Sequence, residues 1–284
     1  MRILITNDDG VNAPGIAVLA RHVSEWIRNC PEGEIREAIV VAPDRNYSGM
    51  SSAVGDVFEN PKVKYKRFHI EGADNIPTYG LDAAPALCAI IGAVGSFNFQ
   101  PDLILSGINA GANVGRSVLH SGTVGAILTG AQLGLSGLAV SVQWGEGTHH
   151  FETAGSVAIE VLDAMKDAPS RSLLNLNVPN LPIGELKGVR RGRISTAGIV
   201  KSAGPKAGGA PLADEGELPL RLGAATPELG DVSDENADED GALVSAGYAS
   251  LTPLRGPQED TSPQFDDLMH KSLNAIDLHL QLHD

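Results

Sequence analysis

Short runs of aliphatic residues alternate along the chain with longer stretches in which apolar positions recur every three or four residues. Aliphatic runs typical of buried strands occur at 2–7, 38–43, 102–109, 138–142 and 173–179. Apolar residues at helical spacing predict helices at 13–29, 83–94, 123–133 and 151–165. Buried strands that alternate with helices are typical of a doubly wound, mostly parallel sheet with helices on both faces. The pattern therefore predicts a three-layer α/β fold.

The pattern changes in two regions of the chain. Residues 53–80 scatter apolar positions among turn-forming residues, which predicts short antiparallel strands. Beyond residue 185 we expect strands at 186–200 and 242–252 and a terminal amphipathic helix at 264–282. We therefore expect two parts: an α/β core over 1–185, and a C-terminal β-rich region over 186–284 that serves oligomerisation, because its segment 186–254 is too thin for a core of its own.

The charge of the chain is concentrated in one segment. The formal net charge is −14, and residues 213–240 contain ten acids against one base, which is −9 of the total. We favour a solvated loop for this segment over an interaction surface or lid. The acidic balance argues against binding to nucleic-acid duplexes or to anionic membranes, which need basic patches.

Cysteine content and the N-terminus indicate a cellular compartment. Cys30 and Cys88 do not have the spacing of a metal site, so two reduced thiols are expected. The chain shows neither a secretory signal nor an apolar run as long as a membrane span. We expect a soluble, cytoplasmic protein.

Two adjacent acids, Asp8 and Asp9, follow the first predicted strand. Ligands of open α/β sheets bind beyond the carboxyl ends of the strands, so these acids are candidates for a site. Two like charges at the end of a buried strand favour a divalent cation nearby. The available donors are carboxylate, amide and hydroxyl oxygens, which suit Mg²⁺ or Mn²⁺ rather than zinc. The alternative is that both acids cap the next helix, and the pattern alone leaves this open.

A glycine-rich segment runs from Ser106 to Ala131. Within it, Ser121, Gly122 and Thr123 lead directly into a predicted helix, whose free N–H groups would suit a phosphate. The segment is neither a Walker loop nor a dinucleotide fingerprint, and a plain flexible loop is the alternative. His120 could contact a substrate or only pack beside the site, whereas His149 and His150 are expected at the surface. A cation beside a phosphate cradle predicts phosphoryl chemistry.

Several motifs occur here in the order in which one known family has them. The stretches ILITNDDG, VVAPDRNYSG, SGINAGANVG, SGTVGA, LLNLNVP and GYASLTPL together resemble the SurE family, survival protein E or 5′/3′-nucleotidases, from residue 1 to about 254. The resemblance implies a Rossmann-like core and a metal-dependent hydrolase of nucleoside monophosphates. It also implies one Mg²⁺ or Mn²⁺ per subunit and a homodimer or homotetramer that exchanges C-terminal elements.

The resemblance also assigns roles to individual residues. It implies metal ligands at Asp8, Asp9, Ser48 and Asn109, and phosphate-binding residues at Asn113, Ser121, Gly122 and Thr123. Asp8, Asp9 and Asn113 would be catalytic, with Gly49 and Gly107 shaping the ligand loops. We expect a water molecule to attack phosphorus, because the metal occupies both acids.

The chain departs from the family pattern at three places. His120 stands where the family usually has tyrosine, Thr129 where it usually has glutamate, and GLDAAPALC where it has GTPADCV. The acidic stretch 213–240 falls in a variable insertion of the family, about 205–240. We expect these changes to affect substrate preference rather than hydrolysis. The alternatives are a broad-specificity phosphatase, a non-catalytic nucleotide-binding protein and, more remotely, a glycosyltransferase that uses paired acids and Mn²⁺.

Overall fold

The computed structural model describes residues 1–195, 200–202, 222–224 and 236–258. Residues Met1–Leu254 form one compact unit and Arg255–Asp284 form a second. The helix predicted over 264–282 and most of the acidic segment lie outside the described residues. The division predicted at residue 185 stays a prediction.

The main sheet has nine strands in the described part of the chain, in the order β3-β4-β2-β1-β5-β6-β7-β11-β8. In this spatial order, the six strands β4, β2, β1, β5, β6 and β7 are parallel to one another. Strand β3 pairs antiparallel with β4, and β11 pairs antiparallel with β7. Their bounds are β1 Arg2–Thr6, β2 Glu37–Pro43, β3 Tyr65–Phe68, β4 Thr78–Leu81, β5 Leu103–Ala110, β6 Ser136–Val142, β7 Leu173–Val178, β8 Val189–Arg191 and β11 Ala249–Leu254. A separate antiparallel pair joins β9 Val200–Ser202 and β10 Leu222–Ala224. The predicted doubly wound, mostly parallel sheet is confirmed.

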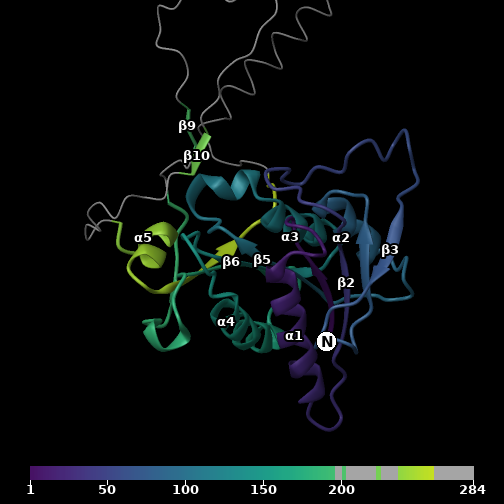
Figure 1. Ribbon diagram of the computed structural model, residues 1–284, viewed down its shortest axis with the longest axis horizontal. Helices are drawn as coiled ribbons and strands as arrows, with labels where there is room; N and C mark the ends of the chain where they lie inside the picture. The colour runs from purple at the N-terminus through teal and green to yellow at the C-terminus, as the bar shows by residue number, and fades with distance from the viewer. Residues whose placement is uncertain (196–199, 203–221, 225–235, 259–284) are drawn as a thin grey trace, which may run out of the picture. The chain divides into compact units, whose positions relative to one another are not determined.

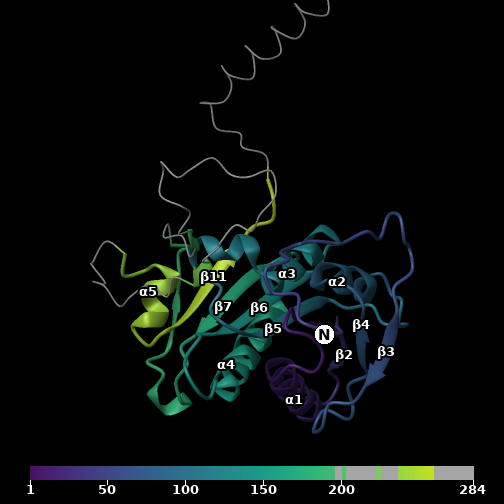
Figure 2. The ribbon, with the colours of Figure 1, turned by 45° about the horizontal axis from the view of Figure 1, so that its top comes forward.

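Helices cover both faces of this sheet. Helices α1 Pro14–Arg28 and α4 Phe151–Ala164 pack together on one face, and α2 Pro85–Ala93 and α3 Gly122–Gln132 on the other (Figure 1 and Figure 2). Shorter helices are η1 Gly115–His120, η2 Met165–Asp167, η3 Ile183–Glu185 and α5 Asp240–Ser245. The three predicted layers are therefore present.

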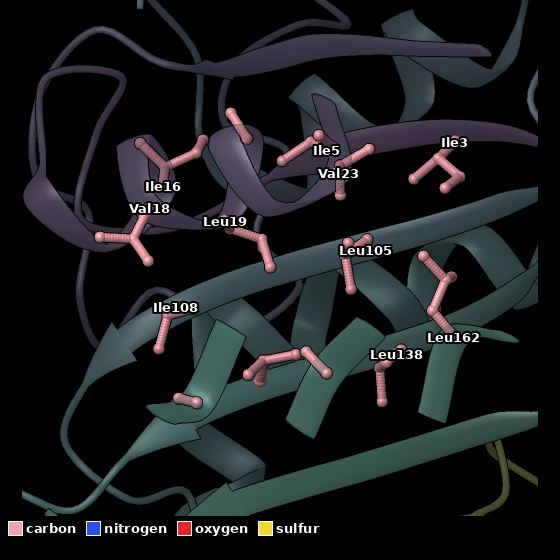
Figure 3. Close-up of a cluster of buried hydrophobic side chains, with 14 of the residues drawn as sticks. Ile3, Ile5, Ile16, Val18, Leu19, Val23, Leu105, Ile108, Leu138 and Leu162 are labelled. Atoms are coloured by element: carbon pink, nitrogen blue, oxygen red, sulfur yellow. The ribbon is translucent and has the colours of Figure 1, made fainter. Parts of the chain in front are cut away.

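Alternating side chains of the strands supply two cores, one under each helix layer. On the α1 and α4 face, Ile3 and Ile5 of β1 and Leu105 of β5 meet Leu19 and Val23 of α1 (Figure 3). On the opposite face, the cluster includes Leu4, Ile104, Val124 and Ile127. Successive strand residues point to opposite faces, so a continuous aliphatic run fills both cores at once.

The order in which the chain adds strands changes direction at β1. The chain adds β2 and β4 on one side of β1, and β5, β6 and β7 on the other. The carboxyl ends of β1 and β5 therefore flank a topological switch point, which is where open α/β sheets bind ligands. Asp8 and Asp9 follow β1, and Asn109 lies at the end of β5.

The short antiparallel strands predicted in 53–80 are found as β3 and β4, which pair antiparallel, and β4 also pairs parallel with β2 in the main sheet. The two strands predicted nearer the C-terminus differ from the structure. In the predicted strand 186–200, the described residues contain β8 and the first residue of β9. The strand predicted from 242 begins only at Ala249, because α5 occupies 240–245. Small apolar runs of this length fit a short buried helix as well as a strand, so the pattern could not separate them.

The end of the acidic segment is not a solvated loop. Asp240 is fully buried, and its neighbours Asp238 and Glu239 pair with Arg193. The expectation of a solvated loop is therefore wrong for Glu239 and Asp240, whereas Asp238 is exposed. Sequence alone could not separate these acids from the rest of the acidic segment, because it does not show which carboxylates have hydrogen-bond or ion-pair partners.

Both cysteines are free thiols, as expected. No helix in the described ranges is long and apolar enough to cross a membrane.

Gly15 of α1 sits directly against the strand β5. A Cβ atom at this position would overlap the backbone carbonyl of Ile108, which cannot rotate away. We expect Gly15→Ala to lower the free energy of unfolding by about 1–3 kcal/mol through overpacking. Thermal unfolding would measure this as a lower Tm. Gly184→Ala is the control, because its Cβ meets no atom within 4 Å; equal Tm values for the two variants would contradict this close packing.

Candidate active site

The turn that carries Asp8 and Asp9 is organised by Asn7. The Asn7 side-chain amide donates to the Gly10 carbonyl (2.9 Å) and accepts the Gly10 N–H (3.2 Å). Gly10 has a φ of +100°, and a Cβ there would lie 2.9 Å from the Arg45 backbone. A residue with a side chain would be strained and would push the β1 and β2 loops apart. Asn7 and Gly10 thus fix the acids beside the loop that follows β2.

Asp8 reaches the start of α3, 115 residues further along the chain. The Thr123 hydroxyl donates to the Asp8 carboxylate (2.7 Å), and the Thr123 N–H adds a backbone hydrogen bond. Gly122 makes this approach possible, because a Cβ there would lie 2.7 Å from the Asp8 Cβ. A carboxylate at a helix N-terminus is favourable, since the helix dipole is positive there. The structure therefore brings Asp8, Gly122 and Thr123 into direct contact.

Asp9 lies half-buried among groups from the β2 and β5 loops. Asn46 donates to its carboxylate (3.3 Å), Ser48 lies 3.5 Å from the same oxygen, and the Ala110 N–H approaches the other oxygen (3.4 Å). His149 lies within electrostatic range of Asp9. Segments that are far apart in the sequence thus converge on this carboxylate.

Both carboxyl groups lie where their charge is disfavoured. Burial raises the pKa of Asp8, and the charge of Asp9 adds to the rise, against the hydrogen bonds from Thr123. Burial also raises the pKa of Asp9, against hydrogen bonds from the surrounding loops. In the part of the chain that the structure describes, no lysine or arginine pairs with either acid. A divalent cation would supply the missing positive charge.

The donors around the acids fit a hard cation. Among the described residues, no group of three His, Cys, Asp or Glu side chains is placed to hold a metal ion. A cation here would therefore need neutral oxygens besides two carboxylates, a set that suits Mg²⁺ or Mn²⁺. Ser48 beside Asp9 offers a hydroxyl oxygen.

Asn109 offers the other neutral oxygen, an amide. Its side-chain nitrogen donates to the Gly111 carbonyl (2.6 Å), so a cation would meet the amide oxygen. The register of β5 on β6 shifts between Ser106 and Asn109, an irregularity of the kind that re-aims side chains at sites. Gly107 inside this shift and Gly49 in the β2 loop have φ values of 139° and 84°.

Asn113 is the most firmly held residue of the loop between β5 and η1. Asn177 of β7 accepts its N–H (2.7 Å) and donates to its carbonyl (3.1 Å), while Asn175 donates to the same carbonyl (2.8 Å). The Asn113 side chain donates to Ser141 of β6 (2.9 Å). All three partners are fully buried. This fixes the backbone of Asn113; whether its amide meets a phosphate stays a prediction.

Sequence reasoning treated 173–179 only as a strand and missed these two asparagines. The signal was present in the chain, because Asn175 and Asn177 alternate with leucine and valine in a buried strand. Residues i and i+2 share one face, and buried amides need hydrogen-bond partners, so a polar segment must cover that face.

Ser121 caps helix α3, and Gly122 begins it. The Ser121 hydroxyl accepts the Val124 N–H (3.1 Å), and Ser121 and Thr123 are both buried. The glycine-rich segment before the cap forms the short helix η1 rather than a loop throughout. The alternative role of Asp8 and Asp9 as caps of the next helix is not found, because α1 has Ala13 at its N-cap and no side-chain cap.

Two residues that depart from the family pattern lie on η1 and α3. His120 is exposed at the end of η1, and its carbonyl accepts the Ser51 N–H (3.3 Å). Thr129 donates to the Gly125 carbonyl inside α3 (2.8 Å). His149 is half-buried and stacks on Phe151, while His150 forms the N-cap of α4. The proximity of His149 to Asp9 was not foreseen, since no periodic pattern links the two.

Comparison with known proteins gives consistent matches. The family model for Survival protein SurE matches residues 3–200. A relative from Shigella dysenteriae serotype 1, named 5′/3′-nucleotidase SurE, is 34% identical over 278 residues, 97% of this chain and 98% of the relative. A relative of the same name from Citrobacter koseri is 37% identical over 256 residues, 89% and 90% of the two chains.

A solved structure matches as well. The crystal structure of the SurE protein from Aquifex aeolicus has a TM-score of 0.69 and 27% sequence identity, and the match covers 96% of this chain and 100% of that one. The family model spans well over half of the 284 residues, and the relatives match nearly from end to end. The chain therefore belongs to the SurE family.

Proposed function

We propose that this protein hydrolyses nucleoside 5′- or 3′-monophosphates to nucleoside and phosphate with one bound divalent cation. The chain is a 5′-nucleotidase, a phosphoric monoester hydrolase of the SurE type, as its full-length relatives of that name indicate. The observation that carries the proposal is the contact between Asp8 and Thr123 (2.7 Å), because it places an acid pair directly beside a helix N-terminus. Positive charge for a phosphate and oxygen ligands for a cation would then lie side by side.

We assign the cation, Mg²⁺ or Mn²⁺, to Asp8, Asp9, Ser48 and Asn109. The Ser48 hydroxyl lies beside the Asp9 carboxylate, and the N–H of Ala110, the residue after Asn109, approaches the other oxygen of Asp9. These contacts support Asp9, Ser48 and Asn109 as neighbours in the site. When bound, such a cation would act as a Lewis acid toward phosphoryl oxygens and toward the attacking water.

The remaining residues of the site would bind and orient the phosphate. The N-terminus of α3, with Ser121, Gly122 and Thr123, would face its oxygens, and the amide of Asn113 would stabilise charge on them. Water forms the new bond to phosphorus, the ester P–O bond breaks, and the nucleoside oxygen leaves with a proton. Water is the nucleophile in this scheme because Asp8 and Asp9 are committed to the cation.

We also propose a cytoplasmic homodimer or homotetramer. Support for assembly comes from the sequence pattern of the C-terminal region. Sedimentation of the purified protein as a monomer at micromolar concentration would contradict it.

Phosphate release from AMP, GMP, CMP, UMP and p-nitrophenyl phosphate, with Mn²⁺, Mg²⁺ or EDTA, tests the activity. We expect release from mononucleotides that EDTA abolishes. Asp8→Asn should reduce it by on the order of hundredfold or more, the scale for removing one electrostatic group from such a site. Asp74→Asn is the matched control, because that acid is exposed and pairs only with His69.

The outcome of this assay distinguishes the proposed nucleotidase from the alternative functions. Release from the synthetic ester alone would indicate a general phosphatase. No release with any cation would favour a nucleotide-binding protein without turnover. Full activity of Asp8→Asn would overturn the metal assignment.

The raised pKa values of Asp8 and Asp9 predict how a cation changes stability. Above the raised pKa values both acids are charged, and in metal-free protein this destabilises the fold; below the ordinary value of 3.8 both are neutral and the cost disappears. We therefore expect Mn²⁺ to raise the Tm at pH 7. At a hundredfold excess over Kd the gain is about 2.7 kcal/mol, or roughly 5–10 °C.

The rise in Tm should shrink as the pH falls, starting above the ordinary range of carboxyl groups, because protons then compete with the cation. Differential scanning fluorimetry at several pH values, with and without Mn²⁺, measures this. The Asp8→Asn variant should show little rise at any pH; a rise equal to that of the parent protein would place the cation elsewhere.

A further inference from the structure

Asp240 is a fully buried carboxylate in the first turn of α5. Its Oδ1 atom accepts the N–H groups of Ser195 (3.1 Å) and Gly241 (2.8 Å). The N–H of Gly115 donates to both oxygens, at 2.9 Å to Oδ2 and 3.1 Å to Oδ1. One side chain of the C-terminal region thus holds the first residue of η1.

Within the described ranges, no lysine or arginine forms an ion pair with Asp240. Arg193 forms its ion pairs with the two preceding acids, Asp238 (3.0 Å) and Glu239 (3.3 Å). Burial raises the pKa of Asp240, against the hydrogen bonds from the three backbone N–H groups. A carboxylate in this position is costly, and the groups it gathers are what offsets the cost. Through these hydrogen bonds, Asp240 links the segments that contain Gly115, Ser195 and Gly241.

Helix η1 connects Asp240 to the proposed phosphate site. Gly115 begins η1, and His120 ends it directly before the cap residue Ser121. The far end of η1 is also held, because the Ser51 hydroxyl donates to the Leu119 carbonyl (2.7 Å). Two residues before Gly115, the backbone of Asn113 is bound to β7. A shift of Gly115 would therefore be passed on to both neighbours that would contact phosphate.

We propose that Asp240 is a positioning residue for the phosphate site, which makes the C-terminal region part of the catalytic apparatus. The inference rests on the proposed function. Asp240 acts through Gly115 and does not touch the substrate. It fixes the distance between Asn113 and the start of α3, and so the width of the cradle.

Two variants and one control test this role. Asp240→Asn keeps the shape and one acceptor oxygen, but places an amide donor against at least one N–H group. Asp240→Ala removes both acceptor oxygens. Asp238→Asn is the matched control, because this acid lies two residues away, is exposed and pairs only with Arg193.

The first measurement is amide hydrogen exchange of the full-length protein, which requires no turnover. We expect both Asp240 variants to speed exchange across residues 113–124, while α1 and β1 exchange as in the parent protein. The control should match the parent throughout. Unchanged exchange at 113–124 in both variants would overturn the proposal, and so would faster exchange spread evenly over the whole chain.

The second measurement is the kinetics of the Mn²⁺-loaded protein with a mononucleotide. We expect Asp240→Asn to raise KM, and the inhibition constant of inorganic phosphate, by about tenfold, the scale for losing one hydrogen bond to a charged acceptor. Loss of folded protein alone would lower kcat and leave KM unchanged, which would contradict a positioning role. An inactive parent protein would overturn the proposed function, whereas hydrogen exchange would still decide the role of Asp240.

Discussion

The hydrogen bond from Thr123 to Asp8 joins the end of the first strand to the start of the third helix, and the geometry of the site depends on it. It requires glycine at 122, since any side chain there would strike Asp8. It brings a buried carboxylate to the positive end of a helix, where part of its charge is balanced. The second acid, Asp9, has no such helix and lies among uncharged donors, so the pair as a whole is left short of positive charge.

Side-chain amides support the loops of the site in place of backbone partners. Asn7 binds both backbone groups of Gly10, and Asn177 binds both backbone groups of Asn113. A loop packed against the end of a sheet would otherwise bury unpaired N–H and C=O groups. Asparagine meets this need because its amide has the same donor and acceptor as a peptide unit. The two loops that flank the proposed cation are held in the same way.

The sequence predicted the parts of the structure that follow a period. Aliphatic runs gave the parallel strands, and the rule that ligands bind at strand ends pointed to Asp8 and Asp9. Motif resemblance pointed to Thr123 and Gly122, which the structure places against Asp8. Periodic patterns do not show which residues from distant segments contact one another. The burial of Asp240, the helix α5 that it begins and the nearness of His149 to Asp9 all depend on contacts between distant segments.

The arrangement around Arg193 has a consequence for how the chain can vary in length. Arg193 and Asp238 to Asp240 exchange backbone hydrogen bonds, and Arg193 also pairs with two of these acids. These contacts join the two ends of the chain between Arg193 and Asp238. The entropy of closing a loop changes only slowly with its length, so a change in the number of residues between these two ends should cost the fold little stability. A closure of this kind separates the length of the enclosed segment from the stability of the sheet that carries the site.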